Sequence, residues 1–162
     1  MGVSGSGKST IADRLAGRLG WRYEDGDRFH PASNVAKMSN GHPLTDEDRW
    51  PWLQAIADEI DRLSAAGERA VIACSALKRA YRDILVHGRD DVRIVFLNGT
   101  QDLIADRLAA RKGHFMPPGL LTSQFKTLEP PQSRERPITV SIDASVEAIV
   151  DDIIRQLNLV AQ

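Results

Sequence analysis

A phosphate-loop motif at the start of the chain restricts its possible folds more than any other feature. The run Gly2-Val3-Ser4-Gly5-Ser6-Gly7-Lys8-Ser9 matches the pattern G-x-x-x-x-G-K-[ST] at every fixed position, and apolar residues recur at helical spacing directly after it. In such a loop, glycines let backbone N–H groups face a phosphate, and the helix N-terminus adds positive potential. A flexible glycine- and serine-rich segment is the alternative. The positions of Lys8 and of the helix favour the phosphate loop.

The polar side chains at the end of this motif have separate expected roles. Lys8 is placed to reach the terminal phosphates of a nucleotide, and Ser9 can ligate magnesium. The Thr10 hydroxyl can add a contact to the inner phosphate. A loop of this kind normally follows a buried strand, yet only Met1 precedes Gly2. We therefore expect the central strand to be missing from the sequence, with a loss of hydrogen bonds and core contacts at the centre of the sheet.

Strand-like and helix-like patterns alternate along the rest of the chain. This alternation predicts one α/β domain over residues 1–162, with a parallel sheet and helices on both faces. Residues 26–45 are expected to form mostly loop and short turns, and residues 129–137 a mobile connection. Strands are predicted at 21–25, 70–74, 92–97 and 138–142, and helices at 9–19, from Pro51 to near Gly67, and at 81–87, 102–111, 120–128 and 146–157.

Composition excludes several classes of protein. The formal net charge of -1 provides no general attraction to nucleic acid or to an anionic membrane, so neither partner is expected. No run approaches the roughly 20 apolar residues that span a bilayer, and no signal-peptide pattern opens the chain. The single cysteine, Cys74, lies in an apolar run and indicates a buried structural thiol in a reduced compartment, by default the cytoplasm.

Charged residues after the predicted strands are the candidates for an acceptor site. Asp25 and Asp27 follow the strand at 21–25, at the edge where ligands bind in open α/β sheets. A group of basic residues suited to an anionic, hydroxyl-rich acceptor follows these carboxylates and the next strand. Each of them alone could be a solvated surface charge. The group consists of His30, Lys37, Arg49, Lys78 and Arg82.

The segment at 26–52 and several later motifs carry a resemblance to a known family. The chain resembles gluconokinase of the thermoresistant type, which is related to the shikimate kinases, and the resemblance covers nearly the whole sequence. The matching motifs are Asp25-Gly26-Asp27, His30-Pro31, Asn34, Lys37-Met38, Gly41, Pro43-Leu44, Asp46, Asp48-Arg49, Pro51-Trp52-Leu53, Cys74-Ser75-Ala76-Leu77-Lys78, Tyr81-Arg82-Asp83, Arg107-Leu108, Ala110-Arg111-Lys112-Gly113-His114-Phe115, Gln124-Phe125 and Thr127-Leu128-Glu129.

The resemblance implies a three-layer P-loop kinase fold with a helical lid, and an activity. That activity is transfer of the ATP γ-phosphoryl group to the terminal hydroxyl of D-gluconate, with Mg²⁺ required. It also implies a homodimer. By similarity, Asp25 lies near the magnesium shell and Asp27 accepts the proton of the acceptor hydroxyl. The residues that hold the sugar acid would be His30, Arg49, Lys78 and Arg82, together with Lys37, Ser75 and His114.

The region 107–128 is expected to form the lid. Arg107 and Arg111 are four residues apart on one helix face, and Lys112 and His114 follow in a glycine-containing turn. Cations that close over a nucleotide stabilise the charge of a phosphoryl-transfer transition state. We therefore expect Arg107 and Arg111 to bind the nucleotide and Arg111 to assist catalysis. A solvated helix end is the alternative.

Two further functions remain open from the sequence. A kinase for another small acceptor, such as shikimate or a nucleoside monophosphate, would share the phosphate loop. A nucleotide-dependent switch would use the same loop without an acceptor pocket, although the chain has no Asn-Lys-x-Asp guanine motif. The strand at 70–74 ends without the carboxylate that often holds magnesium, which directs attention to Asp25. Trp52 is expected in the core rather than in a sugar-stacking platform.

Overall fold

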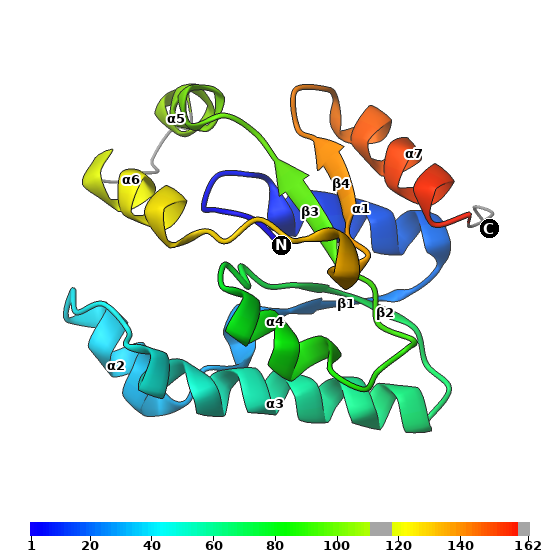
Figure 1. Ribbon diagram of the computed structural model, residues 1–162, viewed down its shortest axis with the longest axis horizontal. Coiled ribbons are helices and arrows are strands. Elements are labelled where there is room, and N and C mark those ends of the chain that lie inside the picture. Colours follow the sequence, from blue (N-terminus) through cyan, green and yellow to red (C-terminus); the bar gives the residue numbers. More distant parts are fainter. Residues whose placement is uncertain (111–117, 159–162) are drawn as a thin grey trace.

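A computed structural model describes residues 1–110 and 118–158 and shows a parallel sheet between two layers of helices (Figure 1). Helices α3 and α4 lie side by side below β1 and β2 in Figure 1, whereas α1 and α7 lie above them. The predicted three-layer α/β arrangement is therefore confirmed. The elements are α1 (Lys8–Leu19), β1 (Arg22–Asp25), η1 (Gly26–Phe29), α2 (Ala32–Ser39), α3 (Asp46–Ala65), β2 (Ala70–Ala73), α4 (Arg79–Val86), β3 (Val95–Asn98), α5 (Gln101–Ala110), α6 (Pro118–Thr127), η2 (Ser133–Glu135), β4 (Ile138–Ser141) and α7 (Val146–Gln156).

The two faces of the sheet have separate hydrophobic cores. One core contains apolar side chains of α1, β3, β4 and α7, including the fully buried Val150 and Ile153. The other contains Trp52, Leu53 and Ile56 of α3 packed against α4. Trp52 is therefore a core residue, as expected from the sequence. No described helix is long and apolar enough to cross a membrane.

The sheet is divided into two pairs of parallel strands. β1 pairs with β2 and β3 pairs with β4, both in parallel register. Met1 and Gly2 connect the pairs: the Met1 amino nitrogen donates to the Val95 carbonyl at 2.6 Å, Leu97 N–H donates to the Met1 carbonyl at 3.0 Å, and Gly2 N–H donates to the Ser75 carbonyl at 3.2 Å. A cavity of about 590 Å³ lies beside this contact and is lined by β2, β3, α1 and α3. The sheet is thus interrupted at its centre, directly before the phosphate loop.

Helix α3 begins at Asp46, five residues before the predicted start at Pro51. Thr45 caps it, because its hydroxyl accepts the Asp48 N–H at 3.2 Å while the Asp48 carboxylate accepts the Thr45 N–H at 2.9 Å. This capping box satisfies two backbone donors at the helix start. Pro51 lies in the second turn, where only one intrahelical N–H is lost. The predicted start at Pro51 was wrong, because the helix begins at the Thr45 cap and includes the proline in its second turn.

Two segments predicted as irregular contain short helices. Helix α2 occupies Ala32–Ser39 within the expected loop, with Asn34 buried and donating to the Asp48 carbonyl at 2.8 Å. The connection at 129–137, expected to be mobile, contains η2, and Glu129 N–H donates to the Leu77 carbonyl at 2.8 Å. Both corrections have one cause, since contacts with distant segments stabilise structure that local propensity does not indicate.

Candidate active site

The phosphate loop lies between the centre of the sheet and the first turn of α1. Gly7, the N-cap residue of α1, has φ of 93°, and no side chain caps the helix, so its N-terminal N–H groups face the loop. Gly5 has φ of 81°, and a Cβ there would lie 2.7 Å from the Leu108 side chain. The loop therefore requires glycine at Gly5 both for its backbone conformation and for its contact with α5.

Lys8 is near both candidate carboxylates. Its Nζ donates to the Val3 carbonyl at 3.0 Å, which places the ammonium group across the loop. Burial lowers the pKa of Lys8, and the negative charges of Asp27 and Asp25 act in the opposite direction. The turn that holds these carboxylates packs against Ala73 of β2, and Ser75, two residues after Ala73, accepts the Gly2 N–H of the phosphate loop. The fold thus brings together a phosphate-binding cation and two acids that are 17 and 19 residues away in the sequence.

The turn after β1 holds the two carboxylates in different ways. Asp25 caps η1, and its Oδ1 accepts the Asp27 N–H at 3.0 Å. Asp27 is exposed. Between them, Gly26 accepts a hydrogen bond from Trp52 Nε1 at 2.8 Å, and a Cβ at Gly26 would lie 2.5 Å from the Ala73 carbonyl oxygen. The Asp-Gly-Asp sequence is therefore fixed against β2 and α3, and it leaves the Asp27 carboxylate available to a ligand.

His30 provides a hydrogen-bonding group rather than a charge. Its ring stacks on Trp52 with centroids 4.2 Å apart, and its Nδ1 lies 3.2 Å from Asn34 Nδ2. Burial lowers the pKa of His30, with the Asp27 charge opposing and the Arg49 charge reinforcing the shift. The imidazole is therefore neutral at pH 7, since its usual pKa is already below that. Its place beside Asp27 supports acceptor binding, but the expectation that it adds positive charge was wrong.

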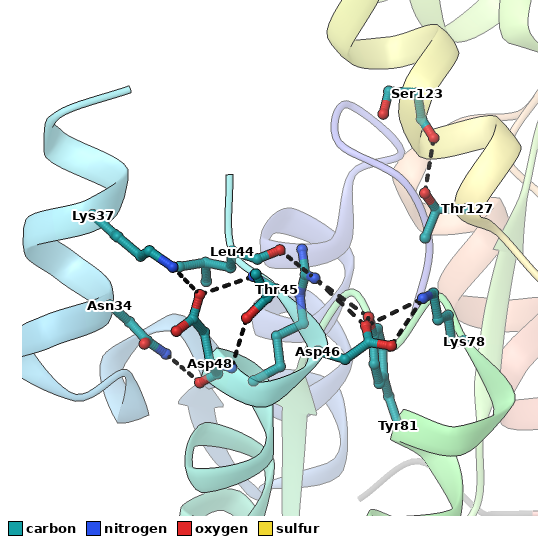
Figure 2. A network of polar contacts seen from close by, with 11 residues as sticks. Asn34, Lys37, Leu44, Thr45, Asp46, Asp48, Lys78, Tyr81, Ser123 and Thr127 are labelled. Atoms are coloured by element: carbon teal, nitrogen blue, oxygen red, sulfur yellow. Dashed lines mark hydrogen bonds and ion pairs between the residues drawn. The ribbon is translucent and has the colours of Figure 1, made fainter. Parts of the chain in front are cut away.

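Lys37 and Asp48 form an ion pair at the start of α3 (Figure 2). Lys37 Nζ lies 2.6 Å from Asp48 Oδ2. The hydrogen bonds from Lys37 and from the Thr45 N–H lower the pKa of Asp48 to about 2. Asp48 thus serves the helix cap and binds Lys37 at the same time, so Lys37 connects α2 to α3 before any acceptor arrives.

A second set of contacts surrounds Asp46 (Figure 2). Lys78 Nζ lies 3.1 and 3.2 Å from the two Asp46 carboxylate oxygens, and the Tyr81 hydroxyl donates to Oδ1 at 2.5 Å. Arg49 donates to the Leu44 carbonyl at 2.8 Å and to the Tyr81 hydroxyl at 3.3 Å. The structure therefore brings Arg49 and Lys78 together, as the sequence predicted, although both surround a carboxylate of the chain itself.

Arg82 is a structural residue and not a ligand of the acceptor. It is 1% exposed and forms an ion pair with Glu135 at 2.7 Å. Its other guanidinium contacts are the carbonyls of Ala76 at 2.9 Å, Leu77 at 3.1 Å and Glu129 at 2.8 Å. The prediction of a substrate contact at Arg82 was wrong, because the sequence does not reveal that the connection after α6 covers this side chain. Arg82 instead fixes the loop that leads to Lys78.

Replacing Arg82 with methionine is expected to destabilise the protein by about 3–5 kcal/mol, because Glu135 and several carbonyls would remain buried without their donor. Denaturant unfolding measures this loss. Arg155→Met is the matched control, since Arg155 is 76% exposed and pairs with Asp152 at the surface, where loss of a pair costs less than about 1 kcal/mol. Equal stability of the two variants would contradict the structural role.

Residues 74–78 connect β2 to α4. The Ser75 carbonyl accepts the Gly2 N–H, so Ser75 contacts the phosphate loop through its backbone. Ala76 follows with φ of 45°, an uncommon conformation for a residue with a side chain. Burial raises the pKa of Cys74 to about 11, so the thiol stays protonated at neutral pH. Cys74 therefore has the structural role that the sequence indicated.

A cavity of about 370 Å³ lies next to the phosphate loop. Its lining combines Gly5–Gly7 and Thr10 with Arg107 and Leu108 of α5 and with residues 144–146 at the start of α7. Arg107 donates to the Ile142 carbonyl, which joins α5 to the end of β4. The sequence indicated Arg107 and Thr10 but missed residues 144–146. Residues 144–146 could have been found from their position after the last strand, because ligands bind at that edge of the sheet.

Helix α6 contacts the phosphate loop directly. Gln124 Oε1 accepts the Ser4 N–H at 2.6 Å, and Gln124 Nε2 donates to the Ser4 hydroxyl at 3.0 Å. The sequence places Gln124 in a family motif but does not indicate its role. This contact places the second half of the expected lid against the loop. Arg111 and His114 lie outside the described residues.

Comparisons with known proteins agree with this geometry. The profile of the shikimate kinase family matches residues 4–158. The thermoresistant gluconokinase of Escherichia coli K12 is 44% identical over 93% of this chain and 86% of its own length. A probable gluconokinase of Mus musculus is 46% identical over 97% of this chain and 95% of its own. The chain belongs to the gluconokinase family. A crystal structure of a gluconokinase from Sinorhizobium meliloti superposes with a TM-score of 0.88, at 43% identity, and covers 98% of this chain and 89% of that one.

The donors of this gluconokinase-family site suit a magnesium ion that binds with a nucleotide. Magnesium usually keeps several waters and binds through one or two carboxylates and substrate phosphates. Ser9 lies exposed in the first turn of α1, and Asp25 lies near the loop. Within residues 1–110 and 118–158, no three His, Cys, Asp or Glu side chains gather in a metal-binding cluster. One carboxylate, one hydroxyl and nucleotide phosphates would be consistent with such an ion.

Proposed function

We propose that this protein transfers the γ-phosphoryl group of ATP to the terminal hydroxyl of D-gluconate, giving 6-phospho-D-gluconate and ADP. The observation that carries this proposal is the meeting of the Lys8 loop and Asp27 beside a group of basic side chains, in a chain that belongs to the gluconokinase family. A nucleotide switch lacks this combination, because it needs no acceptor site, and the gluconokinase relatives favour gluconate over another small acceptor.

The nucleotide is bound by the loop and its adjoining cavity. Backbone N–H groups of residues 2–9 and the N-terminus of α1 surround the phosphates, and Thr10 and Arg107 line the neighbouring space for the rest of the nucleotide. Ser9 and Asp25 would hold Mg²⁺, which neutralises charge on the phosphates. Lys8 binds the terminal phosphate and stabilises the charge on its equatorial oxygens.

Asp27 orients the acceptor and receives its proton. As the acceptor oxygen bonds to the γ-phosphorus, the bond from that phosphorus to the β,γ-bridging oxygen breaks and ADP leaves with the electron pair. The hydroxyl proton passes to the Asp27 carboxylate, which is exposed and near Lys8. His30 lies beside Asp27 and can hold an acceptor hydroxyl through its neutral ring.

The carboxylate of the acceptor is bound by Arg49 and Lys78. We therefore expect D-glucose, which lacks a carboxylate, to have a kcat/KM at least about 10²-fold below that of gluconate, because a site built for a charged group rejects a ligand without it. Steady-state ADP release with each sugar measures this ratio. Equal efficiency with glucose and gluconate would refute the assignment of these two cations.

A panel of acceptors tests the whole proposal. Gluconate, other sugar acids, shikimate and water alone are offered with ATP and Mg²⁺, and phosphorylated products are identified by mass. The expected result is one dominant product, phosphogluconate. Efficient phosphorylation of shikimate would favour the shikimate kinase activity instead, and ATP consumption without acceptor dependence would favour a nucleotide switch.

A further inference from the structure

Charge balance around the acceptor cations leads to an inference that rests on the proposed function. The cations assigned to the acid are already paired within the chain: Lys78 with Asp46, and Lys37 with Asp48. Arg49 lies 4.0 Å from Asp46. Three cations thus face two carboxylates of the chain, so most of the positive charge is already balanced before an acid binds. An acidic acceptor must exchange places with a carboxylate of the chain or be repelled by it.

Asp46 and Asp48 differ in how easily a ligand carboxylate can displace them. Asp48 accepts the Thr45 N–H and completes the cap of α3, so its movement would expose the helix start. Asp46 is the first residue of the helix and has no part in the cap. Its contacts are side-chain contacts from Lys78, Tyr81 and Arg49. Asp46 can therefore turn away without disturbing the helix.

Asp46 and its partners are also exposed enough for a ligand carboxylate to reach them. The side chains of Lys78, Asp46 and Arg49 are each about one third exposed, at 34%, 38% and 30%. Solvent and small anions can therefore reach the pair, in contrast to the buried pair at Arg82. Figure 2 shows Asp46 between Lys78 and the Tyr81 hydroxyl, the position from which a ligand carboxylate would receive the same donors. Hydrogen bonds from Tyr81 and Lys78 lower the pKa of Asp46, which stays charged at neutral pH.

We propose that Asp46 is an internal substitute for the acceptor carboxylate, which occupies Lys78, Tyr81 and Arg49 and is displaced when gluconate binds. Asp46 then determines specificity through competition. It keeps the cations aligned and lowers the affinity for every anion, so that only a ligand with additional hydroxyl contacts displaces it. Inorganic anions such as sulfate, which lack those contacts, are excluded from the site.

The first test is Asp46→Asn, which keeps the shape and removes the competing charge. The KM for gluconate is expected to fall by about tenfold with kcat changed less than about threefold, because the loss of a like charge favours binding of the acid more than the chemical step. Inhibition by sulfate should become stronger by a similar factor. Glu47→Gln is the control, since it removes the same charge from the same exposed helical turn outside these contacts.

A neutral acceptor distinguishes the loss of competition between Asp46 and the acceptor carboxylate from a general loss of structure. Gluconamide has the hydroxyls of gluconate without the carboxylate, so Asp46→Asn should leave its KM within about twofold. Tyr81→Phe removes a donor that Asp46 and the incoming carboxylate would share, so it should change the KM for gluconate less than Asp46→Asn does. Thermal unfolding of each variant shows whether the fold is intact.

The outcomes distinguish this inference from the proposed function. If the wild-type protein fails to phosphorylate gluconate, the function itself is wrong. If the wild-type protein is active and Asp46→Asn raises the KM for gluconate or leaves it unchanged, the competition is refuted and Asp46 only positions Lys78. Equal KM changes for gluconate and gluconamide would refute it as well.

Discussion

Replacing Lys8 with alanine is expected to reduce gluconate-dependent turnover by at least about 10³-fold. Lys8 is the cation of the phosphate loop, and loss of one preorganised donor to transition-state charge already costs about 10²–10³-fold. Its Nζ donates a hydrogen bond to the Val3 carbonyl within the loop itself, so the fold should persist without it. ADP release and thermal unfolding, measured together, test both parts of this expectation.

Lys126→Ala is the matched control for Lys8. Lys126 lies exposed in the last turn of α6, so its replacement removes a lysine without changing the loop. Turnover of this variant should remain within about twofold of wild type, as is usual for surface substitutions. Near-normal turnover of Lys8→Ala would remove the basis for assigning nucleotide binding to residues 2–9.

Asp27→Asn is expected to lower kcat by about 10²–10⁴-fold, the usual contribution of a positioned base, with the loose transition state of phosphoryl transfer favouring the lower end. ATP binding should be retained, because Asp27 is the residue proposed to contact the acceptor. Asp25→Asn should instead raise the Mg²⁺ concentration needed for half-maximal rate, since Asp25 is the carboxylate proposed to hold the ion. The two assignments thus predict different kinetic changes at neighbouring residues.

Measurements of kcat, gluconate KM and Mg²⁺ dependence for both variants test these roles. Asp90→Asn, an exposed change after α4, is the control and should leave all three parameters unchanged. If Asp27→Asn kept full kcat while Asp25→Asn lost it with no shift in Mg²⁺ dependence, the two roles would be reversed.

Local features of the sequence were sufficient to predict the phosphate loop and the order of the elements. The fixed spacing of Gly2, Gly7, Lys8 and Ser9 defines the loop, because the contacts that shape it lie within the motif and the next helix. The hydrophobic periods of strands and helices likewise depend on neighbours in the chain. The carboxylates after β1 were found for a related reason, since residues at the carboxyl end of a parallel strand face the ligand edge.

The start of α3 was present in the sequence but was not recognised. Thr45 and Asp48 have the spacing of a capping box, and this local signal outweighs the proline at Pro51. Its recognition would have placed Asp46 and Arg49 in the first turn of the helix. The pairing of Asp46 with Lys78 still depends on the tertiary structure, because the two residues are 32 positions apart in the chain.

Only the tertiary structure decided which charged residues are available to a ligand. Arg82 and Lys78 are four residues apart and both basic, yet Arg82 is enclosed by residues 129 and 135 whereas Lys78 reaches Asp46 near solvent. His30 is neutral because of its burial against Trp52. These properties depend on desolvation and on partners distant in the chain, which a residue's type and sequence neighbours do not specify. The sequence therefore determined the loop and the sheet edge, and packing determined the charge and accessibility of the side chains around them.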